Sequence, residues 1–532
     1  MRIFRSVILF LASASMLVAA PALAGIYNGA SWAPPALPNS GIAQGSIFTL
    51  TGTGLGPTAL QQAQSYPLPT TQGLAGTAVQ VTVGTVTETC IMIYTVSTQV
   101  AAILPSATPV GTGTLTLTYQ GAKSTIAIHV LAANFGTFAL NEGGSGPAVV
   151  TDTLYNPITL VNTAHPGDIL VLWGTGLGAV TGDETEPPAG GDLGTGVQVY
   201  VGNQPATVLY GGRSSSPGLD QINFVVPAGA NGCKTSIAVL VKGVTGNVTI
   251  TSIAPAGQTV CGDTFNALTT ANLQKAVSSG SLNLGGIQLS RIDNTGDYLL
   301  AQFGNLPLNS LIRSYGGTFA ASIGSCIAYE VSGTSLLLAD PVLPTYLSAG
   351  STLSVSGPNG SKTGAAIATG SFEDLISAVP GSYLATGAYT VTNGSGGSSV
   401  TAFSWGLTLP AQVVPTIPSS VTRSQDLTLT WTGGAQFPVV TIIGYNGVVA
   451  TSPINSYVEF LCTATGSAGQ FTIPSVILNL LPPAGFGNST TAGVNLQVAG
   501  VASNRFSGST APGLDFGLLS AFITSGSVAT LH

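Results

Sequence analysis

The chain has 532 residues, and only 6% of them are charged, against a usual share of about 25%. Its formal net charge is −7, and such a chain lacks the basic face that nucleic acids and anionic membranes require. Seventy glycines and 32 prolines disfavour long helices, whereas Thr- and Val-rich stretches favour strands. Composition therefore argues against a nucleic-acid partner and predicts an all-β protein with several domains.

Residues 1–24 have the pattern of a secretory signal peptide. Arg2 and Arg5 precede an apolar run from Val7 to Ala20, and Ala22–Ala24 is a small-residue cleavage site. A membrane anchor is the alternative, but the run is shorter than the roughly 20 apolar residues of a spanning helix. We expect cleavage, a secreted or cell-surface product, and no membrane insertion afterwards.

One stretch of the chain occurs twice. Gly45–Gly56 reads GSIFTLTGTGLG, and Gly167–Gly178 reads GDILVLWGTGLG. Pro105 and Pro227 keep the same spacing of 122 residues, with small insertions and deletions between these anchors, as a duplicated domain produces. In each copy an alternating apolar strand ends in a glycine-rich corner, where glycine allows a sharp turn.

Further motifs support two tandem immunoglobulin-like β-sandwiches, at residues 25–134 and 135–262. Val79–Gly84 and Val197–Gly202 both follow the pattern Val-x-Val-x-Val-Gly, and short alternating strands with frequent turns favour a two-sheet sandwich. This set of motifs resembles IPT/TIG-type immunoglobulin-like domains, in the tandem form found in large secreted proteins of soil bacteria. The resemblance implies an extracellular binding or spacer module and brings no catalytic residues with it.

The remainder of the chain is predicted to hold a short helix and two further sandwiches. Thr269 to Val277 has a Thr start and a helix-compatible interior, and Gly280 is a stop signal, so residues 263–281 are a predicted helical linker. Alternating segments then return over 282–414 and 415–532. The predicted fold class is all-β: tandem immunoglobulin-like β-sandwiches with a linker helix between the N- and C-terminal halves.

The chain contains five cysteines, and an oxidising compartment favours their pairing. Cys233–Cys261 and Cys326–Cys462 are the plausible disulfides by position. Cys90 lies in an apolar strand and is expected to be a buried free thiol rather than a nucleophile. The chain has no CxxC motif, so neither a zinc site nor a redox motif is predicted.

Few residues suit catalysis. The chain has three histidines and neither an HExxH nor a GxSxG motif, so we predict no catalytic residues, cofactor or metal centre, although a triad could still assemble in space. Glu330 and Glu459 lie in apolar runs near the proposed Cys326–Cys462 bond, so they could approach each other as a carboxylate pair. Ordinary hydrogen-bonded positions are the alternative.

One loop, residues 181–192, concentrates acidic side chains. Oxygen ligands at this density can hold Ca²⁺, but the loop has no EF-hand spacing, so a solvated loop is the alternative. The candidate ligands are Asp183, Glu184, Glu186 and Asp192.

Aromatic residues of the second copy form a candidate binding surface. Leu170 and Leu172 are expected to face the core, which places Trp173 on the opposite face of its strand. Tyr200 and Tyr210 could extend a platform on which sugar rings stack. Packing within the sheet is the alternative role for all three aromatics.

Three functions remain open. The first is a secreted, non-enzymatic surface or matrix protein that presents a binding face for a glycan or a protein. The second is an extracellular carbohydrate-active enzyme with its catalytic part in residues 282–532, which would need two carboxylates about 5–10 Å apart. The third is a purely structural spacer.

Overall fold

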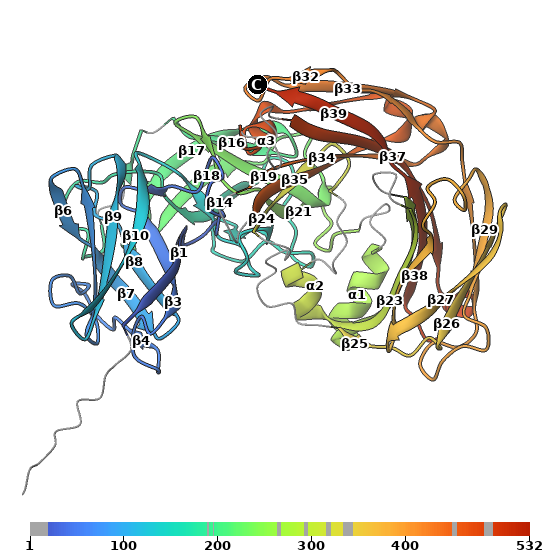
Figure 1. Cartoon of the computed structure of the whole chain (residues 1–532), viewed down its shortest axis with the longest axis horizontal. Coiled ribbons are helices and arrows are strands. Elements are labelled where there is room, and N and C mark those ends of the chain that lie inside the picture. The colour runs from blue at the N-terminus through green and yellow to red at the C-terminus, as the bar shows by residue number, and fades with distance from the viewer. Residues whose placement is uncertain are drawn as a thin grey trace, which may run out of the picture.

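The computed structural model describes residues 20–188, 191–194, 196–262, 268–291, 296–314, 321–332, 344–449, 455–483 and 493–532. Most of the predicted signal peptide lies outside these ranges. The described chain is an all-β protein with an immunoglobulin-like fold, and three short α-helices connect or flank the strands (Figure 1). None of the described helices is long and apolar enough to cross a membrane.

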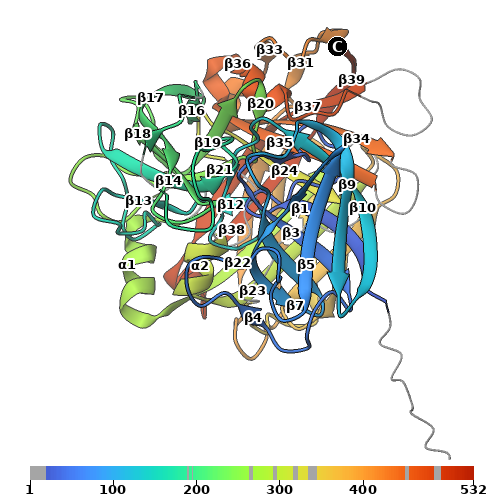
Figure 2. The same cartoon turned by 90° about the vertical axis from the view of Figure 1, so that its left-hand side faces the viewer.

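Repeat 1, the name used for the part predicted at residues 25–134, is a sandwich of two five-stranded sheets whose first strand already begins at Ala22. Its hydrophobic core alternates along the strands, with Phe48 and Leu50 of β3 fully buried, as the period of two predicts. Figure 2 shows β5, β9 and β10 of one sheet side by side. The first sheet runs β1 (Ala22–Asn28), β3 (Ile47–Thr53), β8 (Gln99–Ile103), β7 (Ile91–Val96), β4 (Gln61–Gln62), and the second β2 (Ile42–Ala43), β10 (Ala122–Leu131), β9 (Gly111–Tyr119), β5 (Thr77–Val83), β6 (Val86–Thr89).

Repeat 2, residues 135–262, forms one continuous hydrogen-bonded path because the long strand β17 pairs with β18 at one end and with β16 at the other. Its core lies between the two parts of that path and includes Leu170 and Leu172. The path runs β11 (Gly136–Thr137), β14 (Ile169–Thr175), β18 (Asp220–Val225), β17 (Gln204–Arg213), β16 (Gln198–Val201), β19 (Gly232–Val241), β21 (Thr249–Ile253), β12 (Gly146–Pro147), with β13 (Val150–Thr151), β15 (Gly191–Asp192) and β20 (Val244–Thr245) paired beside it.

The duplicated motif is a strand that turns out of its sheet in both repeats. Leu55 and Leu177 are fully buried after the turn, and Gly176 adopts a φ of 111°. A Cβ on Gly176 would lie 2.1 Å from the carbonyl oxygen of Asn134, so this position requires glycine. Only the second corner is held by a carboxylate: Asp220 Oδ2 accepts hydrogen bonds from Gly176 N at 2.7 Å and Leu177 N at 2.8 Å.

The second corner is also the joint between the repeats. The Thr175 hydroxyl accepts a hydrogen bond from Ile47 N of repeat 1 at 2.8 Å. The buried Arg213 guanidinium lies 3.2 Å from the Asp220 carboxylate and donates to the carbonyl oxygen of Gly45, again in repeat 1. The glycine corner of repeat 2 therefore docks onto the residues that begin the corresponding strand of repeat 1.

The C-terminal half, residues 281–532, is dominated by a 15-stranded sheet. Leu284–Arg291 of β22 pairs in parallel with Phe516–Ile523 of β38, so this sheet crosses the expected boundary at residue 414. In Figure 1, β23, β37 and β38 curve around α1 and α2. The path runs β24 (Cys326–Ser332), β35 (Asn455–Thr465), β34 (Val439–Val449), β37 (Gly493–Phe506), β38 (Phe516–Ile523), β22 (Ser281–Arg291), β23 (Asp297–Pro307), β28 (Ser371–Ser377), β27 (Gly360–Ala368), β26 (Thr352–Gly357), β29 (Gly387–Thr392), β30 (Ser404–Leu409), with β25 (Thr345–Tyr346), β32 (Ser420–Val421) and β39 (Ser525–Leu531) paired beside it and β31 (Val414–Thr416), β33 (Leu427–Thr432) and β36 (Gln470–Ile473) in a separate sheet.

The linker helix α1 (Thr270–Ser279) begins and ends where the sequence predicts. Thr269 is its N-cap and forms a reciprocal capping box with Asn272. Gly280 ends the helix in the left-handed conformation, at a φ of 82°. The helices α2 (Leu308–Ser314) and α3 (Ser475–Leu478) lack such signals and were not predicted.

Two disulfides are present, Cys233–Cys261 and Cys326–Cys462, and they join the pairs expected from the sequence. The second bond links directly opposed residues of β24 and β35. Cys90 is free and buried, and burial raises the pKa of its thiol far above the ordinary range, with the nearby Glu88 charge adding to the shift. A thiol held protonated in this way is a poor nucleophile.

The three parts of the chain are docked on one another. Leu37 of repeat 1 is buried in the core of the C-terminal half, together with Ala238 of repeat 2. Asn39 Nδ2 donates to Glu330 Oε1 of β24 at 2.7 Å. These contacts show that the repeats are packed against the C-terminal half.

Candidate functional site

Trp173 lies on the outer face of the β14–β18–β17 sheet of repeat 2. Leu170 and Leu172 of the same strand face the core, and Trp173 is half-buried on the opposite face, as predicted. Gln221 is its direct cross-strand partner, so this amide lies beside the indole on the same face. The indole Nε1 donates to Thr151 Oγ1 at 3.2 Å, which orients the ring.

A tight turn places a second aromatic ring against this tryptophan. The rings of Tyr155 and Trp173 lie 6.0 Å apart between centroids and are inclined by 36°. Tyr155 is 66% exposed and the adjacent Leu154 is 78% exposed, so both side chains face solvent. Two exposed apolar side chains beside a half-buried indole form an accessible aromatic surface.

The carboxylate of Asp152 holds this turn. Asp152 Oδ1 accepts hydrogen bonds from Leu154 N at 2.8 Å and Asn156 N at 2.9 Å, and Oδ2 accepts from Asn156 Nδ2. The Asn156 side-chain bond is the main cause that lowers the pKa of Asp152 below its ordinary value. Tyr155 has a φ of 66°, an unusual conformation for a residue with a side chain, and the surrounding bonds sustain it.

The other two predicted aromatics occupy different places. Tyr210 is paired with Asn223, which is paired in turn with Val171, so Tyr210 shares the outer face with Trp173 but lies across β18 from it. Tyr200 belongs to β16 and packs against the core of the C-terminal half. The structure therefore brings Trp173 and Tyr210 to one face and leaves Tyr200 elsewhere.

A hollow of about 480 Å³ lies beside the turn, at the start of β14. It contains one histidine, His165, whose Nδ1 lies 3.2 Å from Asp168 Oδ2 and whose Nε2 lies 2.9 Å from the carbonyl oxygen of Gln258. Both ring nitrogens thus face oxygen atoms of the protein, so neither is directed at a ligand as a general base. The hollow is lined by Asp152, Thr153, Ile158, Asn162, Thr163, His165, Gly167, Asp168, Ile169 and Leu170.

The acidic loop uses its carboxylates for hydrogen bonds within the protein. Glu184 accepts from Ser106 N at 2.8 Å and from Ser106 Oγ at 2.6 Å, so it fastens the loop of repeat 2 to repeat 1. Asp183 accepts from Thr185, which lowers the pKa of Asp183, and Asp192 accepts from Gly194 N.

Glu186 is exposed on the same loop. Within the described ranges, no group of three His, Cys, Asp or Glu side chains is arranged to hold a metal ion.

Glu330 and Glu459 do not form a carboxylate pair. Glu330 is opposite Val458 in the β24–β35 ladder, whereas Glu459 is opposite Tyr329. Because successive side chains of a strand alternate between faces, the two glutamates point to opposite faces of the sheet. They cannot act together on one glycosidic bond.

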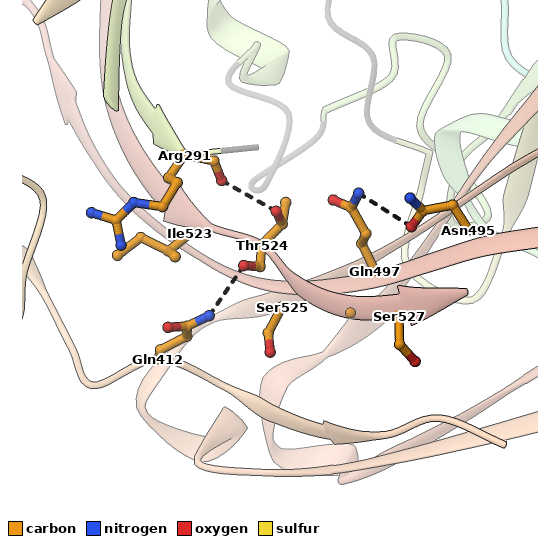
Figure 3. A pocket seen from close by; sticks show the side chains of 9 residues that line it. Arg291, Gln412, Asn495, Gln497, Ile523, Thr524, Ser525 and Ser527 are labelled. Carbon is orange, nitrogen blue, oxygen red and sulfur yellow. Dashed lines mark hydrogen bonds between the residues drawn. The ribbon is translucent and has the colours of Figure 1, made fainter. Parts of the chain in front are cut away.

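A second hollow, of about 410 Å³, lies in the C-terminal half where β38 ends and β39 begins. Figure 3 shows Asn495, Gln497 and Thr524 on one side of the strand and Ser525 and Ser527 on the other. The lining carries amides and hydroxyls and a single charged residue, Arg291, whose guanidinium is bonded to Asp297 Oδ1 at 2.6 Å. This hollow is therefore polar but has no unpaired charge.

The sequence did not identify Tyr155. Its turn, Asp152–Pro157, has an Asp start and an Asn-Pro end, both turn signals, with two apolar residues between them. Apolar residues at the tip of an otherwise polar turn are the signal that could have indicated an exposed contact. Their proximity to Trp173 follows from the pairing of Thr151 with Val171, which the sequence does not show.

No family model matches the chain, and no curated protein is significantly similar to it. Three solved structures illustrate the weak similarities found. The plexin A4 extracellular region is 15% identical over 45% of this chain and 19% of its own, at a TM-score of 0.16. Immunoglobulin domains 1–4 of Sidekick-1 are 9% identical over 96% of this chain and 99% of theirs, at a TM-score of 0.12.

The third structure is SGBP-B of the Bacteroides ovatus mixed-linkage glucan utilization locus, in complex with a mixed-linkage heptasaccharide. It is 10% identical over 85% of this chain and 91% of its own, at a TM-score of 0.13. Similarities with TM-scores this low support no conclusion about function. The fold class rests on the strands and sheets of the chain itself.

Proposed function

We propose that this chain is a secreted, non-enzymatic surface or matrix protein that binds a neutral glycan on the outer face of repeat 2. The observation that carries the proposal is the contact of the exposed Tyr155 ring with the half-buried Trp173 indole. Flat aromatic rings present an apolar face to a pyranose ring, and the neighbouring Gln221 and Asn223 amides offer hydrogen bonds to its hydroxyls. The face contributes no unpaired cation, which suits an uncharged ligand better than an acidic one.

Several features support an extracellular location for this activity. The N-terminal segment has the signal-peptide pattern, and two disulfides close the fold, as is usual in oxidising compartments. The low charge content leaves a surface of Ser, Thr, Asn and Gly, which bonds neutral partners. We also propose that residues 25–134 and 135–262 are IPT/TIG-type domains, on the duplicated glycine corner and the Val-x-Val-x-Val-Gly strands.

Binding and catalysis can be separated in one experiment. The purified mature chain is incubated with insoluble polysaccharides and cell-wall preparations, and both retained protein and released sugar are measured. We expect retention on at least one neutral polysaccharide with no released sugar. Release of sugar would support the enzyme alternative, and absence of both would support a spacer.

The binding face is tested by substitution. Trp173→Ala and Tyr155→Ala should each lower retention about ten-fold or more, because each removes stacking area worth at least about 1.4 kcal/mol. Tyr346→Ala, a partly exposed tyrosine of β25 in the C-terminal half, is the matched control and should bind like the unaltered chain. Unchanged retention in both site variants, at unchanged melting temperature, would overturn the proposed face.

A further inference from the structure

The hollow at the β38–β39 junction borders a stretch of β39 that has no pairing partner among the described strands on one side. The pairing of β22 with β38 ends at Arg291 and Ile523. Further along, β32 pairs with β39 only at Thr530 and Leu531. Along Ser525–Val528, no strand of the described chain pairs with that side of β39. Among the described residues, this side of β39 is therefore a strand edge, and its backbone donors and acceptors border the hollow.

One buried atom at this hollow has no partner. The Gln497 side chain is 3% exposed, and its Nε2 donates to Asn495 Oδ1 at 3.4 Å. Its carbonyl oxygen Oε1 receives no hydrogen bond. A buried acceptor without a donor is destabilising, so a ligand group that donates to Oε1 would gain a hydrogen bond that the protein does not supply.

The surrounding chemistry specifies the kind of donor. Arg291 is occupied by Asp297 and by the carbonyl oxygen of Leu384, so the hollow offers no free charge to an anion. Asn495 donates to Tyr445 Oη at 2.7 Å, and Gln412 donates to the carbonyl oxygen of Thr524 at 3.1 Å. The groups of the lining that stay available to a ligand are hydroxyls, amides and the backbone of β39, and they surround the unsatisfied acceptor Gln497 Oε1.

We infer that this hollow is a second binding site, for a neutral polyhydroxylated ligand whose hydroxyl donates to Gln497 Oε1. A sugar unit carries several hydroxyl donors and acceptors without charge, which is the complement of this lining (Figure 3). A volume of about 410 Å³ lies within the usual range of small-ligand sites. The site is separate from the Trp173 face and does not depend on it.

The test uses the full mature chain and defined probes: cellotetraose, xylotetraose, mannotetraose and sorbitol, with tetragalacturonate as the charged comparison. Binding is measured by saturation-transfer NMR and calorimetry. We expect at least one neutral probe to bind both the unaltered chain and Trp173→Ala, and tetragalacturonate to bind neither. Binding of sorbitol alone would identify a small polyol as the ligand, and binding of a tetrasaccharide would identify a glycan.

Two variants locate the binding. Gln497→Leu removes the acceptor at similar volume and should weaken the Trp173-independent binding at least ten-fold. Val528→Trp should block the hollow without altering the buried amide, because Val528 is 67% exposed and pairs with Asn495, which lies on the same side of the strand as Gln497. This variant carries the test if Gln497→Leu does not fold. The inference would be overturned if no neutral probe bound Trp173→Ala, or if both variants bound the probe as tightly as the unaltered chain; either result would leave the Trp173 face untouched.

Discussion

At the scale of single residues, the chain buries polar groups chiefly at its joints. Glu330 and Asn39 form one such contact: Asn39 Nδ2 donates to Glu330 Oε1, while Glu330 Oε2 and Asn39 Oδ1 are both buried acceptors without a donor. A proton on the carboxyl supplies the missing donor. Burial, opposed by the Asn39 hydrogen bond, raises the pKa of Glu330 to about 7, and no charged group contributes to this shift.

Glu330 should therefore make the stability of the protein pH-dependent. The folded state holds its proton more tightly than the unfolded chain, whose glutamate has the ordinary pKa of 4.5. The stabilisation by this bound proton is complete below about pH 4.5 and is lost as the pH rises through 7. The free energy of unfolding should fall by up to about 3 kcal/mol over this range. Glu330→Gln keeps an acceptor for Asn39 Nδ2 and brings an amide donor that does not titrate, so the variant should be the more stable chain at pH 8.

The measurement is urea unfolding between pH 5 and 8. Burial raises the pKa of Asp220 to about 6, against the opposing charge of Arg213. Asp220 therefore also lowers the stability as the pH rises, and this smaller pH dependence should remain in Glu330→Gln. The exposed Glu373→Gln serves as control and should reproduce the unaltered profile. If Glu330→Gln loses stability with pH as steeply as the unaltered chain, Glu330 does not carry a proton in the folded state.

At the scale of elements, the glycine corner illustrates how a duplicated strand acquires a new role. In repeat 1 the corner closes one sandwich. In repeat 2 the same corner receives a carboxylate from β18 and an arginine from β17, and it docks onto repeat 1 through Thr175. The motif shows where the strand turns, but the partner across the turn determines whether the corner is a joint.

Removing the carboxylate should weaken that joint strongly. Asp220→Ala leaves Arg213 buried without its counter-charge and leaves two backbone N–H groups unsatisfied, so we expect a loss of about 3–5 kcal/mol of unfolding free energy. Asp192→Ala removes an exposed turn carboxylate of the same repeat and should cost less than about 1 kcal/mol. Similar denaturant midpoints for the two variants would contradict a structural role of the Asp220 corner.

At the scale of the whole molecule, the chain is a docked assembly. Leu37 of repeat 1 lies in the core of the C-terminal half, and Glu184 of repeat 2 bonds Ser106 of repeat 1. Because the parts are packed against one another, the Trp173 face and the β38–β39 hollow are held at fixed positions relative to each other. A ligand chain long enough to reach both sites could then engage them at high effective concentration.

Leu37→Ala tests this docking. Deleting a fully packed leucine costs about 2–5 kcal/mol of unfolding free energy. Because Leu37 lies in the core of the C-terminal half, calorimetry should show the unfolding transition of that half at a lower temperature. Leu60→Ala, an exposed leucine of repeat 1, is the control and should leave the thermogram unchanged. A shift confined to repeat 1 would mean that the Leu37 contact does not hold the C-terminal half.

The local order of the chain could be predicted from the sequence because it depends on short-range chemistry. Alternation of apolar residues places Leu170 and Leu172 inside and Trp173 outside, and Thr269 and Gly280 cap α1. Long-range pairing could not be predicted in this way. The parallel contact of β22 with β38 joins residues more than 200 positions apart, and no periodicity encodes such a partner.

The sequence by itself determined the all-β class, the duplicated glycine corner and the outward position of Trp173, since each follows from side-chain spacing and polarity along the chain. It made the two cysteine pairs plausible by position, and the tertiary structure established them. The tertiary structure alone decided which residues meet: Tyr155 beside Trp173, Tyr200 away from it, Glu330 against Asn39, and Gln497 without a donor at the β38–β39 hollow. Binding surfaces are made by such encounters, because a ligand contacts several strands at once.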